Sequence, residues 1–174
     1  MQNQASHTGP RRVRLLNGWW DFLPVEHTDL TQPLKPEAVP SDGWAEKAYL
    51  VPGFFTDHPY PQAWRQGRSG WARTTFSVSE LRPGERAYLT VKAAIPEIHI
   101  FVNGQKLAEQ EDMFIGDEID VTDALRSGDN ELALFLTEFE TFPHPESGEV
   151  KLIDVPWGCC ISRRTAGIWQ GVEL

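Results

Sequence analysis

Hydrophobic and polar residues alternate most clearly where Ile98, Ile100 and Val102 are separated by single residues. This period of two is typical of a β-strand with one buried face. The run ends in Asn103-Gly104, and a second strand-like run at 105–109 follows it. Asn-Gly between two such runs predicts a two-residue hairpin turn, because both central positions of a type I′ turn need a positive φ.

Short strand-like runs of this kind recur along most of the chain, bounded by Gly, Pro, Asn and Asp. Helical periodicity is nearly absent, and its strongest signal is a single turn at Val121–Leu125. The pattern predicts an all-β fold, an antiparallel β-sandwich of two sheets packed face to face in jelly-roll order. The predicted strands are Trp19–Leu23, Lys47–Val51, Ala72–Val78, Ala87–Lys92, Ile98–Val102, Gln105–Glu109, Phe114–Asp120, Glu131–Thr137 and Ile168–Leu174.

The same alternation predicts which side chains face the core, since successive side chains of a strand point to opposite faces. The residues expected to point inward are Leu89, Val91, Ile98, Ile100, Val102, Leu132, Leu134 and Leu136. Those expected to point outward are Tyr88, Lys92, His99 and Glu131. Four tryptophans on or beside strands are expected to pack in the core, namely Trp19, Trp20, Trp71 and Trp169.

Three long irregular stretches interrupt the strands, at 26–46, 52–70 and 138–166. Loops of this length are uncommon unless they are functional or disordered. The second and third are rich in Trp, Phe, Tyr, His and Pro, a composition that argues against disorder. A binding site is therefore expected in these two loops.

Several motifs follow one another in a fixed order along the chain. They read Leu16-Asn17-Gly18-Trp19-Trp20-Asp21-Phe22, Val51-Pro52-Gly53, Trp71-Ala72-Arg73-Thr74-Thr75-Phe76, Phe101-Val102-Asn103-Gly104, Asp120-Val121-Thr122, Gly128-Asp129-Asn130 and Thr165-Ala166-Gly167-Ile168-Trp169-Gln170-Gly171-Val172-Glu173-Leu174. In this order and spacing they resemble the N-terminal sugar-binding domain of glycoside hydrolase family 2, which includes β-galactosidases, β-glucuronidases and β-mannosidases. The resemblance covers about Leu15 to Leu174 and implies a fold like that of galactose-binding domains.

The resemblance also implies an accessory role. In that family the domain is followed by an immunoglobulin-like sandwich and a (β/α)8 barrel, and the barrel carries the two carboxylates of a retaining glycosidase. We therefore expect no catalytic residue in this chain. The implied function is that of a non-catalytic carbohydrate-binding or accessory domain of a glycoside hydrolase acting on β-linked sugars. Its implied partners are carbohydrate, bound weakly in isolation, and the downstream domains of the parent enzyme.

Two positions depart from the family pattern. The return strand usually carries "H-x-G-G-[FY]", whereas this chain reads Gln110-Glu111-Asp112-Met113-Phe114. Galactosidases of the family place an aspartate shortly before "G-I-[FW]", where it helps to hold the terminal sugar and a sodium ion. Here Ile161 lies near that place, and Asp154 is the nearest upstream acid. Both departures weaken the expectation of a galactosidase-type sugar contact.

Sugar recognition needs flat apolar faces that stack on C–H surfaces and polar groups that bind hydroxyls. The aromatic candidates in the two loops are Phe54, Phe55, Tyr60, Trp64 and Trp157, and the polar ones are His58, Arg65, Asp154, Arg163 and Arg164. The predicted site, where the two loops meet at one end of the sandwich, comprises Trp64, Arg65, Asp154, Trp157, Arg163 and Arg164. The alternative is that the same residues pack the sandwich end or dock on other domains.

No metal and no cofactor is expected. The acidic residues Glu109, Glu111, Asp112, Asp117, Glu118 and Asp120 alternate along and between strands, so they diverge, whereas Ca²⁺ needs six to eight converging oxygens. They are expected to form a solvated face. Gly67-Arg68-Ser69-Gly70 does not fit the G-x-S-x-G pattern of a nucleophile elbow.

Composition narrows the remaining functions. The 174 residues carry a net charge of -9, which argues against nucleic acid as a partner, and no apolar run is long enough to span a bilayer. Residues 1–12 are expected to form a flexible polar tail, and 13–174 a single sandwich domain. The cysteines are neighbours, Cys159 and Cys160, so they are expected to be reduced thiols of a cytoplasmic protein. An independent carbohydrate-binding module and a protein-interaction sandwich remain as alternative functions.

Overall fold

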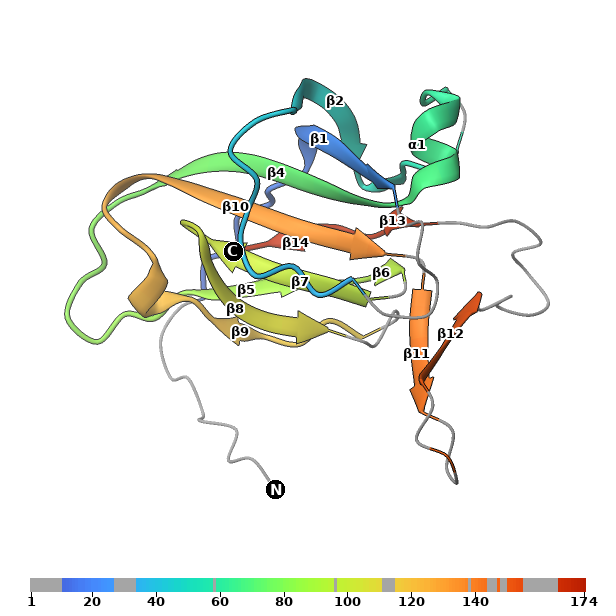
Figure 1. Cartoon of the computed structure of the whole chain (residues 1–174). Helices are drawn as coiled ribbons and strands as arrows, with labels where there is room; N and C mark the ends of the chain where they lie inside the picture. The colour runs from blue at the N-terminus through green and yellow to red at the C-terminus, as the bar shows by residue number, and fades with distance from the viewer. Residues whose placement is uncertain are drawn as a thin grey trace.

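A six-stranded antiparallel sheet forms one layer of the molecule. The computed structural model describes residues 11–26, 34–57, 59–95, 97–110, 115–137, 139–143, 147, 150–154 and 166–174. The strands of the sheet, in spatial order, are β2 (Ala45–Val51), β1 (Gly18–Glu26), β4 (Arg68–Val78), β10 (Gly128–Thr137), β7 (Glu97–Val102) and β8 (Gln105–Gln110). The long strand β10 pairs with β4 along one edge and with β7 along the other, so it lies inside the sheet (Figure 1).

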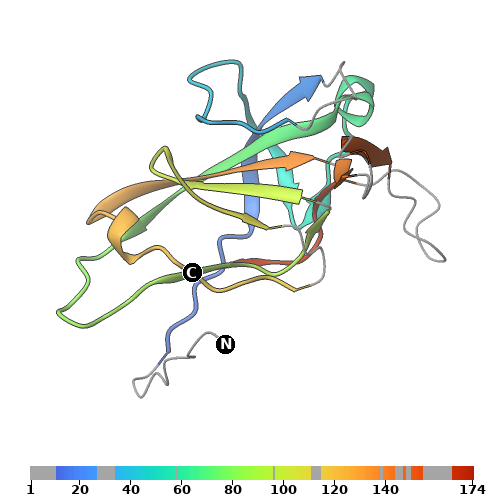
Figure 2. The ribbon, with the colours of Figure 1, turned by 60° about the horizontal axis from the view of Figure 1, so that its bottom comes forward.

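Two short three-stranded sheets form the opposing layer. One contains β14 (Val172–Glu173), β5 (Tyr88–Val91) and β9 (Ile119–Asp120), and the other β3 (Gly53–Phe54), β13 (Gly167–Ile168) and β6 (Ala94–Ile95). A hairpin of β11 (Phe139–Pro143) and β12 (Val150–Asp154) follows β10. Figure 2 shows the two layers apart, with the C-terminus on the layer of short strands.

The strand pairings confirm the predicted all-β antiparallel sandwich, since every described pairing is antiparallel. The helical content of the described residues is α1 (Gln62–Gly67) and a 3-10 turn at Thr122–Ala124, the latter inside the predicted helical turn. The described part of the chain contains no helix with the length and apolar character needed to cross a bilayer.

The core between the layers has the predicted composition. All eight side chains expected to point inward are at most 1% exposed: Leu89, Val91, Ile98, Ile100, Val102, Leu132, Leu134 and Leu136. On the expected outer face, Lys92 is exposed and Tyr88 and Glu131 are half-buried. The inner face of the sheet could therefore be predicted from the period of two.

His99 lies on the outer face as expected, but this face is covered here and the side chain is fully buried. A second apolar cluster of Trp71, Phe101, Ala133 and Phe135 covers the other face of the six-stranded sheet. Leu34, Val39 and Trp44, in the segment between β1 and β2, pack on this cluster. The centre of the sheet is therefore buried on both faces, and His99 lies under this second cover, against the ring of Phe135.

Trp19 is placed differently from its prediction. Trp19 and Trp20 are consecutive on β1 and must point to opposite faces. Trp20 is in the core and donates a hydrogen bond to the Leu16 carbonyl (2.8 Å), whereas Trp19 is 58% exposed. Trp71 is buried as expected, and Trp169 is half-buried.

Two predicted strands are shorter than expected. Of Phe114–Asp120, only Ile119–Asp120 pairs, with β5, and Gly116 lies so close to β5 that a Cβ there would be 2.1 Å from the Val91 carbonyl oxygen. Phe114 is outside the described residues. Ile168–Leu174 is divided into β13 and β14, which join different sheets. The elements missed in the loops are β3, α1, β6, β11 and β12.

The Asn103-Gly104 turn has the predicted conformation, with φ of 51° and 81°. The Asn103 amide donates to the Ala124 carbonyl and to Asn130 Oδ1, both at 2.8 Å, and its own Oδ1 accepts from the Glu131 amide at 3.0 Å. Asn130, 1% exposed, closes the 126–130 corner by donating to the carbonyls of Arg126 and Gly128. Two asparagines therefore connect two separate corners of the chain through hydrogen bonds.

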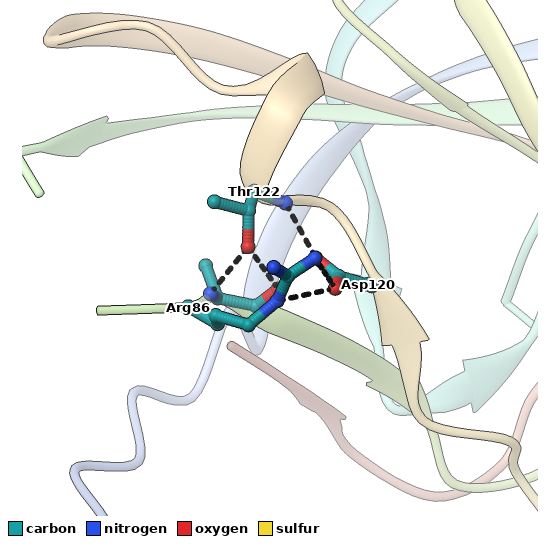
Figure 3. Close-up of polar contacts among 4 residues, drawn as sticks. Arg86, Asp120 and Thr122 are labelled. Carbon is teal, nitrogen blue, oxygen red and sulfur yellow. Dashed lines mark hydrogen bonds and ion pairs between the residues drawn. The ribbon is translucent and has the colours of Figure 1, made fainter. Parts of the chain in front are cut away.

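A second polar network fixes the junction of β5 and β9 (Figure 3). Asp120 accepts from the Thr122 amide at 3.0 Å and from Arg86 Nε at 2.7 Å. The Thr122 hydroxyl accepts from the Ala87 amide at 2.9 Å. Partial burial disfavours the charged carboxylate, but the hydrogen bonds from Thr122 and Arg86 outweigh it and lower the pKa of Asp120. The Asp120-Val121-Thr122 motif is therefore a structural corner.

Replacing Gly104 with Val tests the turn. The change should lower the free energy of unfolding by about 1–3 kcal/mol, because a β-branched residue is strained at positive φ. Open space surrounds the position of the missing Cβ, so the loss would come from the backbone and not from a clash. Denaturant unfolding measures it, with Gln105→Val on the next, exposed residue as control. Equal stability of the two variants would contradict the assigned turn.

Candidate functional site

The loop that carries the first site candidates folds onto one end of the sandwich. It forms β3 and then α1, which packs against β1 and β4 at the end where β13 lies (Figure 1). The peptide bond between Val51 and Pro52 is cis. The Phe55 amide donates to the Ala166 carbonyl at 3.1 Å, and the Ala166 amide donates to the Thr56 hydroxyl at 2.9 Å. The loop is thus held directly against the start of β13.

Tyr49 connects the strands at this end of the sandwich through its hydroxyl group. Its fully buried hydroxyl accepts a hydrogen bond from the Ile168 amide at 2.8 Å and donates to the Gly53 carbonyl. It therefore joins β2, β3 and β13. Burial disfavours the phenolate and raises the pKa of Tyr49 well above its usual range.

Trp64 of α1 is buried in this end of the core. Only 8% of its surface is exposed, and its ring packs on Phe22 at 4.5 Å between centroids. It stacks on Tyr60 at 5.7 Å with an angle of 16° between the rings. Phe55 is also fully buried. These aromatics pack the sandwich end, which was the alternative to sugar stacking.

The other predicted site residues are placed only in part. Arg65 is exposed on α1, and Asp154 is the last residue of β12, opposite Phe139. Trp157, Arg163 and Arg164, together with His58, lie outside the described residues. The convergence of the two loops into one site therefore stays a prediction. Among the described aromatic candidates, Phe54 and Tyr60 keep part of their surface exposed.

Tyr60 links this exposed surface to the edge of the large sheet. Its hydroxyl accepts a hydrogen bond from the Leu50 amide at 2.9 Å. Leu50 lies opposite Trp19 in the pairing of β2 with β1, and it is 41% exposed. The exposed pair of Trp19 and Leu50 was missed by the sequence analysis, although the consecutive tryptophans already required one of them to face outward.

A shallow depression lies at the opposite end of the large sheet. Its lining residues are Val39, Pro40, Ser41, Arg73, Asn103, Gly104, Arg126 and Glu131. Arg73 in it is already paired, since it contacts Asp21 at 3.1 Å and Glu131 at 3.7 Å. The Arg73 guanidinium also lies 4.2 Å from the centre of the Trp44 ring. These contacts explain the arginine of the Trp71–Phe76 motif as a structural residue.

Comparison with known proteins shows which proteins share this fold and these motifs. The sequence model of the family described as "Glycosyl hydrolase 2 galactose-binding domain-like" matches residues 46–168. A β-galactosidase of Alteromonas mediterranea is 28% identical over 148 residues. That alignment covers 74% of this chain and 14% of the β-galactosidase.

Solved structures agree on the fold. A β-glucuronidase of an uncultured Clostridium species superposes with a TM-score of 0.68 at 21% identity, over 99% of this chain and 30% of its own. A β-D-mannosidase from Dictyoglomus thermophilum gives a TM-score of 0.61 at 20% identity, over 94% of this chain and 22% of its own. The chain thus spans less than a third of the length of each of these relatives.

Substituting Phe for Tyr49 tests the junction of β2, β3 and β13. The loss of the hydroxyl removes the acceptor of the buried Ile168 amide, so the free energy of unfolding at neutral pH should fall by about 1–3 kcal/mol. Unfolding followed by tryptophan fluorescence gives the difference.

The pH dependence of that difference is a second check. The raised pKa means that the contribution of the neutral phenol is complete below pH ~10, the unfolded value, and falls as pH rises beyond it. Wild type should therefore lose more stability above pH ~10 than Tyr49→Phe. Parallel stability curves for the two proteins across this range would show that the phenol is not held neutral by the fold.

Proposed function

Since this chain belongs to the glycosyl hydrolase 2 galactose-binding domain-like family, we propose that it is the non-catalytic accessory domain of a glycoside hydrolase acting on β-linked sugars. In this role it shapes the mouth of an active site and docks on the domain that carries the catalytic carboxylates. We also propose a cytoplasmic location, because its only two cysteines are neighbours and neighbouring cysteines rarely form a disulfide.

One observation carries the proposal: the family match and the shared fold lie on a part of each relative that is less than a third of its length. Those relatives are named as a β-galactosidase, a β-glucuronidase and a β-mannosidase, so hydrolysis of a β-linked sugar is the activity they share. Their sugars differ, and the proposal therefore names the linkage class and not one sugar.

The carboxylates of this chain support a non-catalytic role. A retaining glycosidase uses two carboxyl groups about 5 Å apart, one of them free to protonate the leaving group. Here Asp21 is paired with Arg73, Asp120 with Arg86 and Glu109 with Lys106. These carboxylates already stabilise the fold through their basic partners.

Docking on another protein surface is favoured by the exposed pair of Trp19 and Leu50. A tryptophan that is 58% exposed beside a leucine that is 41% exposed places apolar area on the edge of the large sheet. Aromatic residues of this kind are enriched in protein interfaces. The buried position of Trp64 points the same way, since a ring packed in the core offers little face to a sugar.

The purified chain should not hydrolyse aryl β-galactosides, β-glucuronides or β-mannosides. The reason is that, in the proposed role, the two catalytic carboxylates lie in another domain, a (β/α)8 barrel. Release of the chromogenic aglycone is the measurement, with a complete family 2 enzyme as positive control. Turnover that survives repurification and disappears on mutation of one acid of this chain would overturn the accessory role.

Sugar contact and docking can be separated by titrating galactose, glucuronate and mannose while recording amide chemical shifts. We expect only weak binding, with shifts developing in the millimolar range, because one or two stacked rings leave little free energy after the cost of association. Shifts confined to 52–70 and 138–166 that are lost in Trp157→Ala, but kept in Trp19→Ala, would support sugar contact. Shifts spread over other strands would contradict the predicted site. No shifts at high millimolar sugar would make docking the better account.

A further inference from the structure

Three titratable side chains meet on the outer face of the large sheet, apart from the predicted sugar site. Glu97 and His99 are two residues apart on β7 and point to the same face, and Glu109 lies directly opposite His99 on β8. Glu97 pairs with Thr137 of β10, which in turn pairs with Ser69 just after α1. The group therefore lies at the α1 end of the sheet.

The group is buried without the hydrogen bonds that burial normally requires. The side chain of His99 is 0% exposed and that of Glu97 is 8% exposed. Among the described residues, neither ring nitrogen of His99 has a hydrogen-bond partner. Buried polar atoms in native proteins are nearly always bonded, and an exception commonly marks the place of a bound water or ion. His99 is therefore the feature of the core that needs an explanation.

Carboxylate oxygens are nevertheless close to both nitrogens. Glu97 Oε1 lies 3.0 Å from His99 Nε2, and Glu109 Oε1 lies 3.4 Å from Nδ1. A contact of 3.0 Å that is not a hydrogen bond has its oxygen well away from the axis of the nitrogen lone pair. An ion placed on that axis, about 2.1 Å from both the nitrogen and the oxygen, would have an N–ion–O angle of about 90°. This is the angle between neighbouring ligands of an octahedral ion. One donor atom from each of the three side chains also lies within 4.8 Å of the others.

Charge distinguishes the two carboxylates. Glu109 is 35% exposed and already has two cations, Lys106 at 2.8 Å and Lys35 at 3.9 Å. The hydrogen bond from Lys106 is the main cause that lowers the pKa of Glu109. Glu97 is the more buried of the two, and His99 is its partner among the described ion pairs. A buried carboxylate is unfavourable when few opposite charges lie near it. An added cation beside Glu97 would therefore be favoured.

We propose that Glu97 and His99 bind a divalent transition-metal ion, with His99 Nε2 and a Glu97 carboxylate oxygen as ligands. Glu109 acts as a positioning residue: with the ion bound, its Oε1, which lies 3.4 Å from Nδ1, would accept the Nδ1 proton and leave Nε2 free to bind the ion. Carboxylates that hold the second nitrogen of a metal-bound histidine in this way are common. One imidazole with one carboxylate and water suits Mn²⁺ or Zn²⁺ better than the all-oxygen sites of Ca²⁺. The ion would fix the start of β7 at the end of the sheet that carries α1.

Mn²⁺ is the probe of choice, because the thiols of Cys159 and Cys160 and the other four histidines of the chain compete more strongly for Zn²⁺. The decrease of the free-ion EPR signal during titration of the whole chain should show one saturable site. In a two-dimensional NMR spectrum, sub-stoichiometric Mn²⁺ should broaden the amide signals of 97–100 and 108–110 first. Broadening that starts at surface acids such as Asp123 and Asp129, or no uptake below about 1 mM, would overturn the proposal and leave the three residues as a buried ion-pair cluster.

Variants separate the ligand from the positioning residue. Glu97→Gln should abolish the site, whereas Glu109→Gln should weaken Mn²⁺ binding by about 10–100-fold, the usual effect of losing a carboxylate behind a metal-bound histidine. Glu118→Gln, an exposed carboxylate paired with Arg11, is the matched control and should leave binding unchanged. Glu97 is buried, so its replacement can also unfold the chain; the variant at the partly exposed Glu109 tests the site without that complication. Unchanged binding in Glu109→Gln would refute the assignment even if Glu97→Gln cannot be studied.

Discussion

The burial of β7 and β10 on both faces is the constraint on which the rest of the structure depends. β10 is hydrogen-bonded along both edges, and its residues from Leu132 to Thr137 are all buried. The inner face meets the short sheets, and the outer face meets Trp44 and its neighbours from the segment between β1 and β2. Water cannot reach either face, so any polar group placed there must find a partner within the protein. This requirement accounts for the Ser69–Thr137 hydrogen bond and makes His99 exceptional, since neither of its ring nitrogens has a hydrogen-bond partner among the described residues.

The motifs that identify the family consist mainly of residues that supply hydrogen-bond partners to polar groups at the corners of the fold. Asn103 and Asn130 provide side-chain partners for backbone groups of two turns, and Asp120 does the same at the start of the 3-10 turn. Asn17 accepts from the Val172 amide at 3.0 Å and so joins the first motif to the last. Because these residues stabilise the backbone, their presence reports the fold and not the sugar.

Several features that have no role in the corner hydrogen bonds lie at the α1 end of the sandwich. It combines the buried aromatic cluster under Tyr60, the exposed guanidinium of Arg65 and, across the sheet, the Glu97–His99–Glu109 group. The edge strand β2 and its neighbour β1 add the exposed pair of Leu50 and Trp19. In the proposed role, one end of the domain would face a sugar and one edge a neighbouring domain, with a rigid centre between them. The doubly covered sheet supplies that centre.

The sequence by itself determined the six strands of the large sheet, the inner face of that sheet and the Asn103-Gly104 turn, because these follow from local periodicity and from φ preferences that each residue carries with it. It also determined the family, since the order of the corner motifs is preserved along the chain. Only the tertiary structure decided that the outer face of the sheet is covered as well. The covering segment lies far from β7 in sequence and has no periodicity of its own, so the alternation around His99 does not show what buries it. The meeting of His99 with Glu109 likewise depends on strand pairing, and the burial of Trp64 on the packing of a short helix against Phe22. These are contacts between distant segments, and a local pattern carries no information about them.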